Sequence, residues 1–311
     1  LFIIYKCISY IYRVLNFKNM ENIINVNIDP ILASFGNWVV SWHGFFSFLG
    51  VVFAVSLVGE WARDYKIDKE DILHVAVWGI IGGVIGARIV HVIDYWWFYG
   101  DQPLEIFKIW KGGIGVWGGV LGGFAGGILC SHINKYPKFI MADIAAPALL
   151  FAMVIGRLGD IVNGEHCAKA YEGIFAFSWD HPNSDVSSCK MKGSGIGVAV
   201  QPAIMYEMIW NLISVYILWY FRFRLYPHGM TWVLFILLYS AGRFFISFLR
   251  YDRIWAMGLT EAQWIAVVCI VVCLPIIIIN LNYSKSNIFQ LMTNEGKTRA
   301  ERRRSAKSKN K

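Results

Sequence analysis

Arg157 and Asp160 stand where a long apolar run, residues 139–155, gives way to the segment GRLGDIVNGE at residues 156–165. A guanidinium binds phosphate through paired hydrogen bonds, and a carboxylate accepts protons. Spacings of three and four residues place Arg157, Asp160 and Gly164 on one helix face. A charge near the bilayer centre costs at least ~2.5–3.5 kcal/mol, so it persists when it is paired, faces protein or water, or acts on a ligand. This face is therefore the first candidate functional site.

A second basic face lies farther along the chain. Four of its residues are spaced by four, four and three positions, so they lie on one side of a helix: Tyr239, Arg243, Ser247 and Arg250. With Arg157, these arginines exceed the acids expected on the same faces, which favours an anionic ligand such as a phosphate. The alternative is neutralisation by acids on neighbouring helices, such as Asp160 or Glu207.

A polar stripe also crosses the apolar segment 72–97, where Arg88, His91 and Asp94 are three residues apart. The spacing leaves two interpretations of Arg88 open: a ligand contact, or a structural ion pair near the membrane interface. Asp94 fits the structural interpretation. The many glycines of residues 112–127 allow helices to approach closely, and packing explains most of them.

His43 is a candidate base because histidine titrates near physiological pH. At the start of its apolar segment it could equally be an interfacial polar residue. Glu207 lies about one turn inside a helix expected to begin near Pro202, where the helix dipole favours a carboxylate. We interpret Glu207 and Asp143 as structural residues.

The composition places these residues in a membrane. The 311-residue chain is 57% hydrophobic and 16% charged, against about 25% charged in soluble domains, and its mean hydropathy is +0.48. A helix needs about 20 largely apolar residues to span a bilayer. We therefore predict an all-α integral membrane protein with about seven transmembrane helices in one bundle. The expected spans are Trp38–Val58, Ile72–Trp97, Gly112–Ser131, Phe139–Asn163, Pro202–Phe221, Met230–Leu249 and Glu261–Leu281.

Seven spans put the two ends of the chain on opposite sides of the membrane. Residues 285–311 hold nine basic and two acidic residues, a net charge of +7. A basic tail beside a last span is typical of a cytoplasmic end, so the N-terminus and the loop 165–200 are expected outside. Nucleic-acid binding is the competing interpretation of such a tail and is disfavoured here. An amphipathic piece, 104–111, could lie along the membrane interface.

Three regions follow from this division. They are an N-terminal segment, 1–37, in which Met20 is a candidate start of translation; a seven-span domain, 38–281; and the basic tail, 282–311. The six cysteines show no metal-binding spacing. Cys167 and Cys189 share the outward loop and could form a disulfide if that loop faces an oxidising compartment.

The ordered set of these segments resembles the prolipoprotein diacylglyceryl transferase family, over about residues 27–281. The order of the pieces is more specific than any one of them. The matching pieces are WHG (42–44), GAR (86–88), PLEI (103–106), WKGG (110–113), Asp143 with Pro147, residues 156–165, Pro202 with Tyr206 and Glu207, and Tyr239 with Arg243.

The resemblance implies an integral enzyme of the bacterial cytoplasmic membrane. It moves a diacylglyceryl group from phosphatidylglycerol to the lipobox cysteine thiol of a prolipoprotein, and glycerol 1-phosphate leaves. Arg157 and Arg243 match the family's essential arginines, and no metal or organic cofactor is implied. The expected catalytic residues are Arg157, Arg243, Glu165 and His43. The expected lipid-binding residues are Arg157, Asn163, Gly164, Arg243, Tyr239 and Arg88.

This sequence also departs from the family pattern. Asp160 replaces an Asn, Ile161 a Phe, Trp117 a His, His43 a Tyr, Gln201 a His and Ser247 a Glu. Asp160 could partly neutralise Arg157. We hypothesise that His43 takes over some proton handling, because one His is gained where another is lost. The alternative function is a membrane protein that binds a phospholipid or carries an anion without group transfer.

Overall fold

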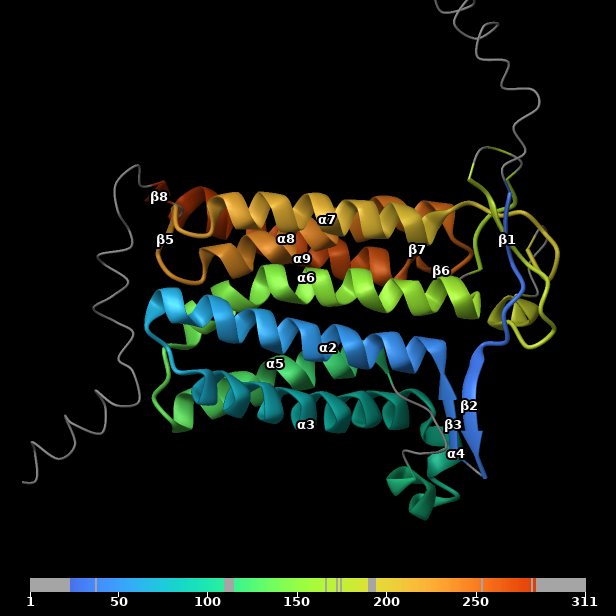
Figure 1. Cartoon of the computed structure of the whole chain (residues 1–311), viewed down its shortest axis with the longest axis horizontal. Helices are drawn as coiled ribbons and strands as arrows, with labels where there is room; N and C mark the ends of the chain where they lie inside the picture. Colours follow the sequence, from blue (N-terminus) through green and yellow to red (C-terminus); the bar gives the residue numbers. More distant parts are fainter. Residues whose placement is uncertain are drawn as a thin grey trace, which may run out of the picture.

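Long helices lie side by side in the computed structural model, along the horizontal axis of Figure 1. The structure describes residues 23–36, 38–108, 115–165, 167–171, 173, 175–189, 194–252, 254–280 and 282–283. The long helices are α2 (Trp42–Trp61), α3 (Lys69–Asp94), α5 (Val116–Ile133), α6 (Lys138–Asn163), α7 (Ala203–Phe221), α8 (Met230–Ile246) and α9 (Glu261–Asn280). They make a largely helical bundle, as the sequence predicts.

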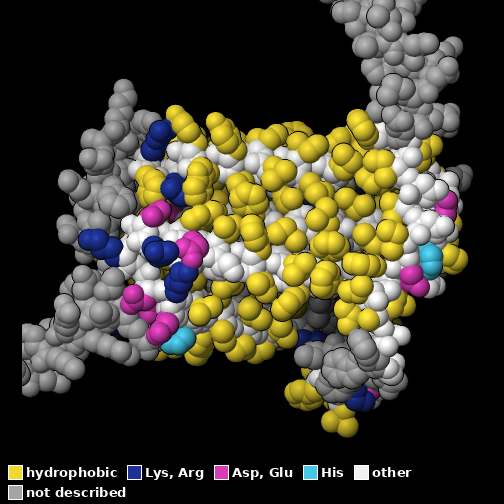
Figure 2. Space-filling model, in the orientation of Figure 1, with side chains coloured by type: hydrophobic (Ala, Val, Ile, Leu, Met, Phe, Trp, Pro, Cys, Tyr) yellow, Lys and Arg dark blue, Asp and Glu magenta, His cyan; other side chains and the backbone are white. Residues whose placement is uncertain are grey.

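Six of these helices are long and apolar enough to cross a membrane, namely α2, α3, α6, α7, α8 and α9. The described apolar part of α5, Gly118–Ile133, is shorter. Figure 2 shows hydrophobic side chains covering the middle of the bundle, with charged side chains gathered at its ends. Ile279 and Phe245, for example, are 77% and 68% exposed. Exposed apolar surface on this scale marks contact with lipid, so the chain is a multi-pass membrane protein.

The first helix begins four residues later than predicted. Residues Trp38–Ser41 form strand β3, which pairs antiparallel with β2 (Ile31–Phe35). Ser41 then caps α2, because its Oγ accepts a hydrogen bond from the Gly44 amide at 3.1 Å. The apolar run therefore includes the end of an extramembrane hairpin, which hydropathy cannot separate from a span.

Glycines join α3 closely to α5. A Cβ atom on Gly86 would meet the carbonyl oxygen of Gly118, and one on Gly122 would meet that of Gly82. Side chains are excluded at these positions because the two backbones touch. The packing interpretation of the glycines is therefore confirmed for the described part of α5.

Arg88 fastens the segment that follows α3 to that helix. This segment contains α4 (Trp96–Tyr99) and the 3₁₀ helix η3 (Pro103–Phe107). Nε of Arg88 donates to the Ile106 carbonyl at 2.8 Å, and its guanidinium lies 5.1 Å from the Tyr99 ring centroid. Only residues 104–108 of the amphipathic piece expected at 104–111 are described, and most of them belong to η3.

The loop between α6 and α7 has its own buried core at one end of the bundle, on the right of Figure 1. Strand β4 (Phe177–Trp179) pairs parallel with β1 (Ile24–Val26), and the 3₁₀ helix η5 (Asp185–Ser188) follows. Hairpin β6 (Ile254–Ala256)–β7 (Leu259–Thr260) lies at the same end. The core contains Val26, Ala168, Phe177, Trp179, Val186, Cys189 and Val200.

Asp143 joins α6 to the start of α8 near the opposite end of the bundle, where β5 (Leu225–Tyr226) pairs with β8 (Asn282–Tyr283). Its two carboxylate oxygens accept hydrogen bonds from the Gly229 and Trp232 amides, at 2.7 and 2.9 Å. These amides belong to the first turn of α8, which has no intrahelical acceptor for them. The structural interpretation of Asp143 is confirmed.

Replacing Asp143 by Asn is expected to lower stability without changing the function of the folded protein. The amide keeps one acceptor oxygen and loses the other, so one buried N–H is left without a partner, at a cost of about 1–3 kcal/mol. Thermal melting of the purified protein measures the loss. An unchanged melting temperature would show that the cap contributes little.

Candidate active site

His43, Asp160 and Glu165 meet at the end of the bundle that carries the folded loop. His43 lies in the first turn of α2, Asp160 in the last turn of α6, and Glu165 directly after that helix. Nδ1 of His43 lies 2.5 Å from Oδ1 of Asp160 and 3.3 Å from Oε2 of Glu165. The other oxygen of Asp160 pairs with the Arg157 guanidinium. The expected neutralisation of Arg157 by Asp160 is therefore confirmed, and Asp160 bridges an arginine and a histidine.

Gly159 allows α2 to come this close to α6. A Cβ atom at this position would lie 2.5 Å from the Cα atom of His43 and 2.9 Å from the Trp42 carbonyl oxygen. Real Cβ contacts are never so short, so any other residue here must push the start of α2 away from Asp160.

Replacing Gly159 by Ala is therefore expected to separate His43 from Asp160 and to destabilise the protein by about 1–3 kcal/mol, as overpacking does. Gly156→Ala is the matched control, because a Cβ at Gly156 meets only the Ser47 Oγ at 3.7 Å. Melting temperature and transfer activity check both. Equal effects of the two substitutions would contradict the close approach.

Glu207 is the centre of an arginine cluster between α6, α7 and α8. Its Oε2 lies 2.6 Å from Arg157, and its Oε1 lies 2.5 Å from Arg243 and 3.7 Å from Arg250. The residue is only 6% exposed. One buried carboxylate thus holds three guanidinium groups from two helices and the turn after α8. Neutralisation of the arginines by an acid on a neighbouring helix, one of the two interpretations that the sequence left open, is therefore confirmed for Glu207.

Acids balance the arginines more fully than the sequence suggested. Arg250 also pairs with Asp252 at 3.1 Å, and Arg157 pairs with Asp160. Three guanidinium groups therefore face three carboxylates within the described residues, so the expected surplus of positive charge is wrong. An anionic ligand must compete with Glu207 and Asp160 for the arginines, which both acids hold in place.

Two more of the expected lipid-binding residues, Asn163 and Gly164, lie beside Glu165. Asn163 is 3% exposed, and its Nδ2 donates to Oε1 of Glu165 at 3.0 Å. Its Oδ1 is buried without a hydrogen-bond partner among the described residues. Gly164 ends α6 with a φ of +70°, a left-handed conformation that glycine adopts without strain.

A small cavity opens between α7 and α8 beside Arg243. Its lining residues are Glu207, Trp210, Asn211, Tyr239, Gly242, Arg243 and Ile246. Tyr239 and Arg243, both expected to bind lipid, therefore share this cavity with Glu207. Arg88 is bonded instead to the segment after α3, which favours its structural interpretation; a role in lipid binding stays a prediction.

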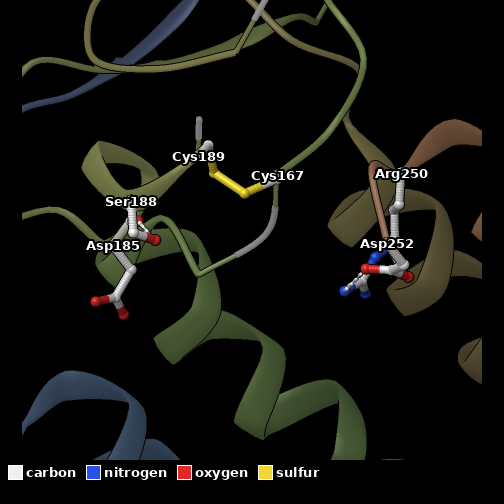
Figure 3. Close-up of a disulfide and its surroundings, with 6 residues drawn as sticks. All are labelled: Cys167, Asp185, Ser188, Cys189, Arg250 and Asp252. Atoms are coloured by element: carbon white, nitrogen blue, oxygen red, sulfur yellow. Dashed lines mark hydrogen bonds and ion pairs between the residues drawn. A yellow bond between two sulfur atoms is a disulfide. The ribbon is translucent and has the colours of Figure 1, made fainter. Parts of the chain in front are cut away.

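A disulfide ties the loop between α6 and α7 together beside this site (Figure 3). Cys167 and Cys189 are bonded, with their Cα atoms 5.6 Å apart. The sequence left this bond open, and the structure forms it. In Figure 3 the Asp185 carboxylate points away from the disulfide. The charge of Asp185, which the sequence analysis did not single out, acts on both His43 and Glu165.

The environment of Glu165 favours its neutral form. Burial raises the pKa of the Glu165 carboxyl above its ordinary value, and the charges of Asp160 and Asp185 act in the same direction, against His43. A carboxylate with a raised pKa is a stronger proton acceptor than an ordinary one. The pair His43 and Glu165 can therefore exchange protons with a bound reactant.

The same three side chains are the metal-ligand candidates among the described residues. One ligand atom from each of His43, Asp160 and Glu165 lies within 4.8 Å of the others. However, one Asp160 oxygen already contacts His43 and the other pairs with the Arg157 guanidinium, whose charge repels a cation. This donor set fits proton handling better than a metal centre.

The chain is similar in sequence to one family of known proteins. A model of the prolipoprotein diacylglyceryl transferase family matches residues 30–279. Phosphatidylglycerol–prolipoprotein diacylglyceryl transferase from Listeria monocytogenes is 33% identical over 81% of this chain and 89% of its own length. The enzymes from Staphylococcus haemolyticus and Staphylococcus aureus are 33% and 30% identical, over 82% and 81% of this chain and 90% and 88% of theirs. The chain belongs to the prolipoprotein diacylglyceryl transferase family.

Proposed function

We propose that this protein transfers the diacylglyceryl group of phosphatidylglycerol to the lipobox cysteine thiol of prolipoproteins, releasing glycerol 1-phosphate. The observation that carries the proposal is the arginine pair Arg157 and Arg243. Glu207 holds both arginines next to the cavity that Tyr239 lines, and the chain belongs to this family. Guanidinium groups fixed in advance stabilise negative charge that grows on a leaving phosphate. The substrates are those named for the relatives.

The remaining site residues have proposed roles in the same reaction. Asn163 offers its free Oδ1 to a hydroxyl of the lipid headgroup, and Gly164 shapes the turn that carries Glu165. His43 accepts the thiol proton, because the thiolate is the nucleophile, and Glu165 beside it is a second group that can exchange protons with His43. Group transfer of this kind needs no resident cofactor.

We also propose a topology for the chain. With α5 as a seventh span, the outer loop and its disulfide lie outside the bacterial cytoplasmic membrane, and the C-terminus lies in the cytoplasm. A disulfide persists in an oxidising compartment, which supports this orientation. Residues 38–281 then form the transferase domain. Residues 284–311 of the basic tail, 282–311, and most of the N-terminal segment lie outside the described residues.

The test is transfer of radiolabelled diacylglycerol from phosphatidylglycerol vesicles to a lipobox peptide by the purified full chain. Label in the peptide, with glycerol 1-phosphate released in equal amount, supports the proposal. Binding of phosphatidylglycerol with no transfer by a folded protein would favour the alternative of a lipid-binding or anion-carrying membrane protein.

A further inference from the structure

The two nitrogens of His43 lie in different surroundings. Nδ1 contacts Asp160 at 2.5 Å. Nε2 has no hydrogen-bond partner among the described residues, and the side chain is 43% exposed. One nitrogen is thus held by the protein while the other is available to a reactant at the surface. This is the arrangement of a base that a third group orients.

Asp160 is itself held in place. It is 1% exposed, and both of its carboxylate oxygens are in use, one by His43 and one by Arg157. Arg157 is tied in turn to Glu207 on α7 at 2.6 Å. A buried carboxylate with fixed oxygens accepts only the N–H of the Nδ1 tautomer, so it leaves Nε2 as a proton acceptor.

We propose that Asp160 is a positioning residue for His43, and that the two form a catalytic dyad whose nucleophile is the cysteine of the substrate peptide. This inference rests on the proposed transferase function and deepens it. Nucleophile, base and orienting acid then form a triad divided between two molecules, with His43 Nε2 facing the thiol.

The reaction step balances without an oxidant, reductant or metal. The S–H proton moves to Nε2 of His43, and the thiolate attacks the glyceryl carbon that carries the phosphate. The C–S bond forms as the C–O bond breaks, and the electron pair leaves on the oxygen of glycerol 1-phosphate. The proton on His43 then passes to water.

Other charged groups also act on His43. Arg157 and Asp160 face it from α6, Glu165 from the turn after that helix, and Asp185 from η5. Of these, Asp160 makes the shortest contact and is the most buried. Asp160 is therefore the group that fixes the tautomer, while the others set the local charge.

The experiment compares two lipobox peptides, one with cysteine and one with selenocysteine at the acceptor position. A selenol is already ionised near neutral pH, so it needs no base. Full-length wild type, Asp160→Asn and His43→Gln are assayed for transfer from phosphatidylglycerol vesicles between pH 5 and 8. Asp143→Asn is the matched control, because it makes the same chemical change on α6 at an acid that only caps α8.

We expect each dyad variant to lower kcat for the cysteine peptide about 100-fold, the usual contribution of a general base. KM for phosphatidylglycerol should change much less. With the selenocysteine peptide the loss should nearly vanish. Since the two residues act as a unit, the double variant should be no slower than either single one. Asp143→Asn should have the same effect on the rate of transfer to both peptides.

Two outcomes would overturn the dyad. One is an equal loss with both peptides in Asp160→Asn, which would mean that Asp160 serves only Arg157 and the lipid. The other is full activity of His43→Gln at every pH; this variant changes a half-exposed side chain and should fold. Failure of wild type to modify either peptide would instead refute the proposed function.

Discussion

Replacing Arg157 by Ala is expected to lower the rate of diacylglyceryl transfer at least about 100-fold. Removing one fixed donor to a developing negative charge typically costs about 10²–10³ in rate. Arg157 contacts both Glu207 and Asp160, so its loss also frees the two acids that order the site. Radiolabel transferred to a lipobox peptide, measured over time at saturating lipid, gives the rate.

Two further substitutions make this result specific. Arg157→Lys keeps the charge but loses the planar fork of donors, so it should recover only part of the activity. Arg63→Ala is the matched control, because Arg63 is a 68% exposed arginine that pairs with Glu60 at the end of α2 remote from the site. Transfer by Arg157→Ala within twofold of wild type would contradict the phosphate-facing role.

The spans could be predicted because membrane helices are defined by length and hydropathy. Six predicted spans agree with the helices to within a few residues, for example Phe139–Asn163 with α6. The layer of short strands and loops at the α6–α7 loop end of the bundle could not be predicted in this way. Its strands are two to five residues long, and its core depends on pairings such as Ile24 with Phe177, which are distant in sequence.

The candidate site was predictable where its contacts are local. The step of three residues from Arg157 to Asp160 gave their ion pair correctly. For Glu207 the sequence left two explanations open, because the helix dipole accounts for an acid in a first turn as well as ion pairs with the arginines do. Its real partners come from α6, α8 and the turn after α8, and only the fold brings them together.

The contact between His43 and Asp160 shows the same limit. Both stand out in the sequence as departures from the family pattern, but they are 117 residues apart. Nothing in the spacing says that they touch. The close approach of α2 to α6 at Gly159 brings them into contact.

Replacing Glu207 by Gln is expected to have the largest effect on stability. The change leaves Arg157, Arg243 and Arg250 close together without their shared carboxylate. Removing one partner of a buried ion pair costs about 3–5 kcal/mol. We therefore expect a melting temperature several degrees lower, together with loss of transfer. Glu60→Gln is the matched control, because Glu60 is half-exposed with two surface partners, and surface pairs contribute little.

A double variant separates stability from catalysis at the same place. Adding Arg243→Met to Glu207→Gln removes one of the uncompensated charges, so part of the lost stability should return. Transfer should stay lost, because a phosphate donor is now missing as well. If the double variant instead recovers transfer, Arg243 is not needed for the lipid phosphate. If Glu207→Gln alone has the melting temperature of wild type, contacts other than this carboxylate hold the arginines. The arginine cluster around Glu207 then does not organise the site.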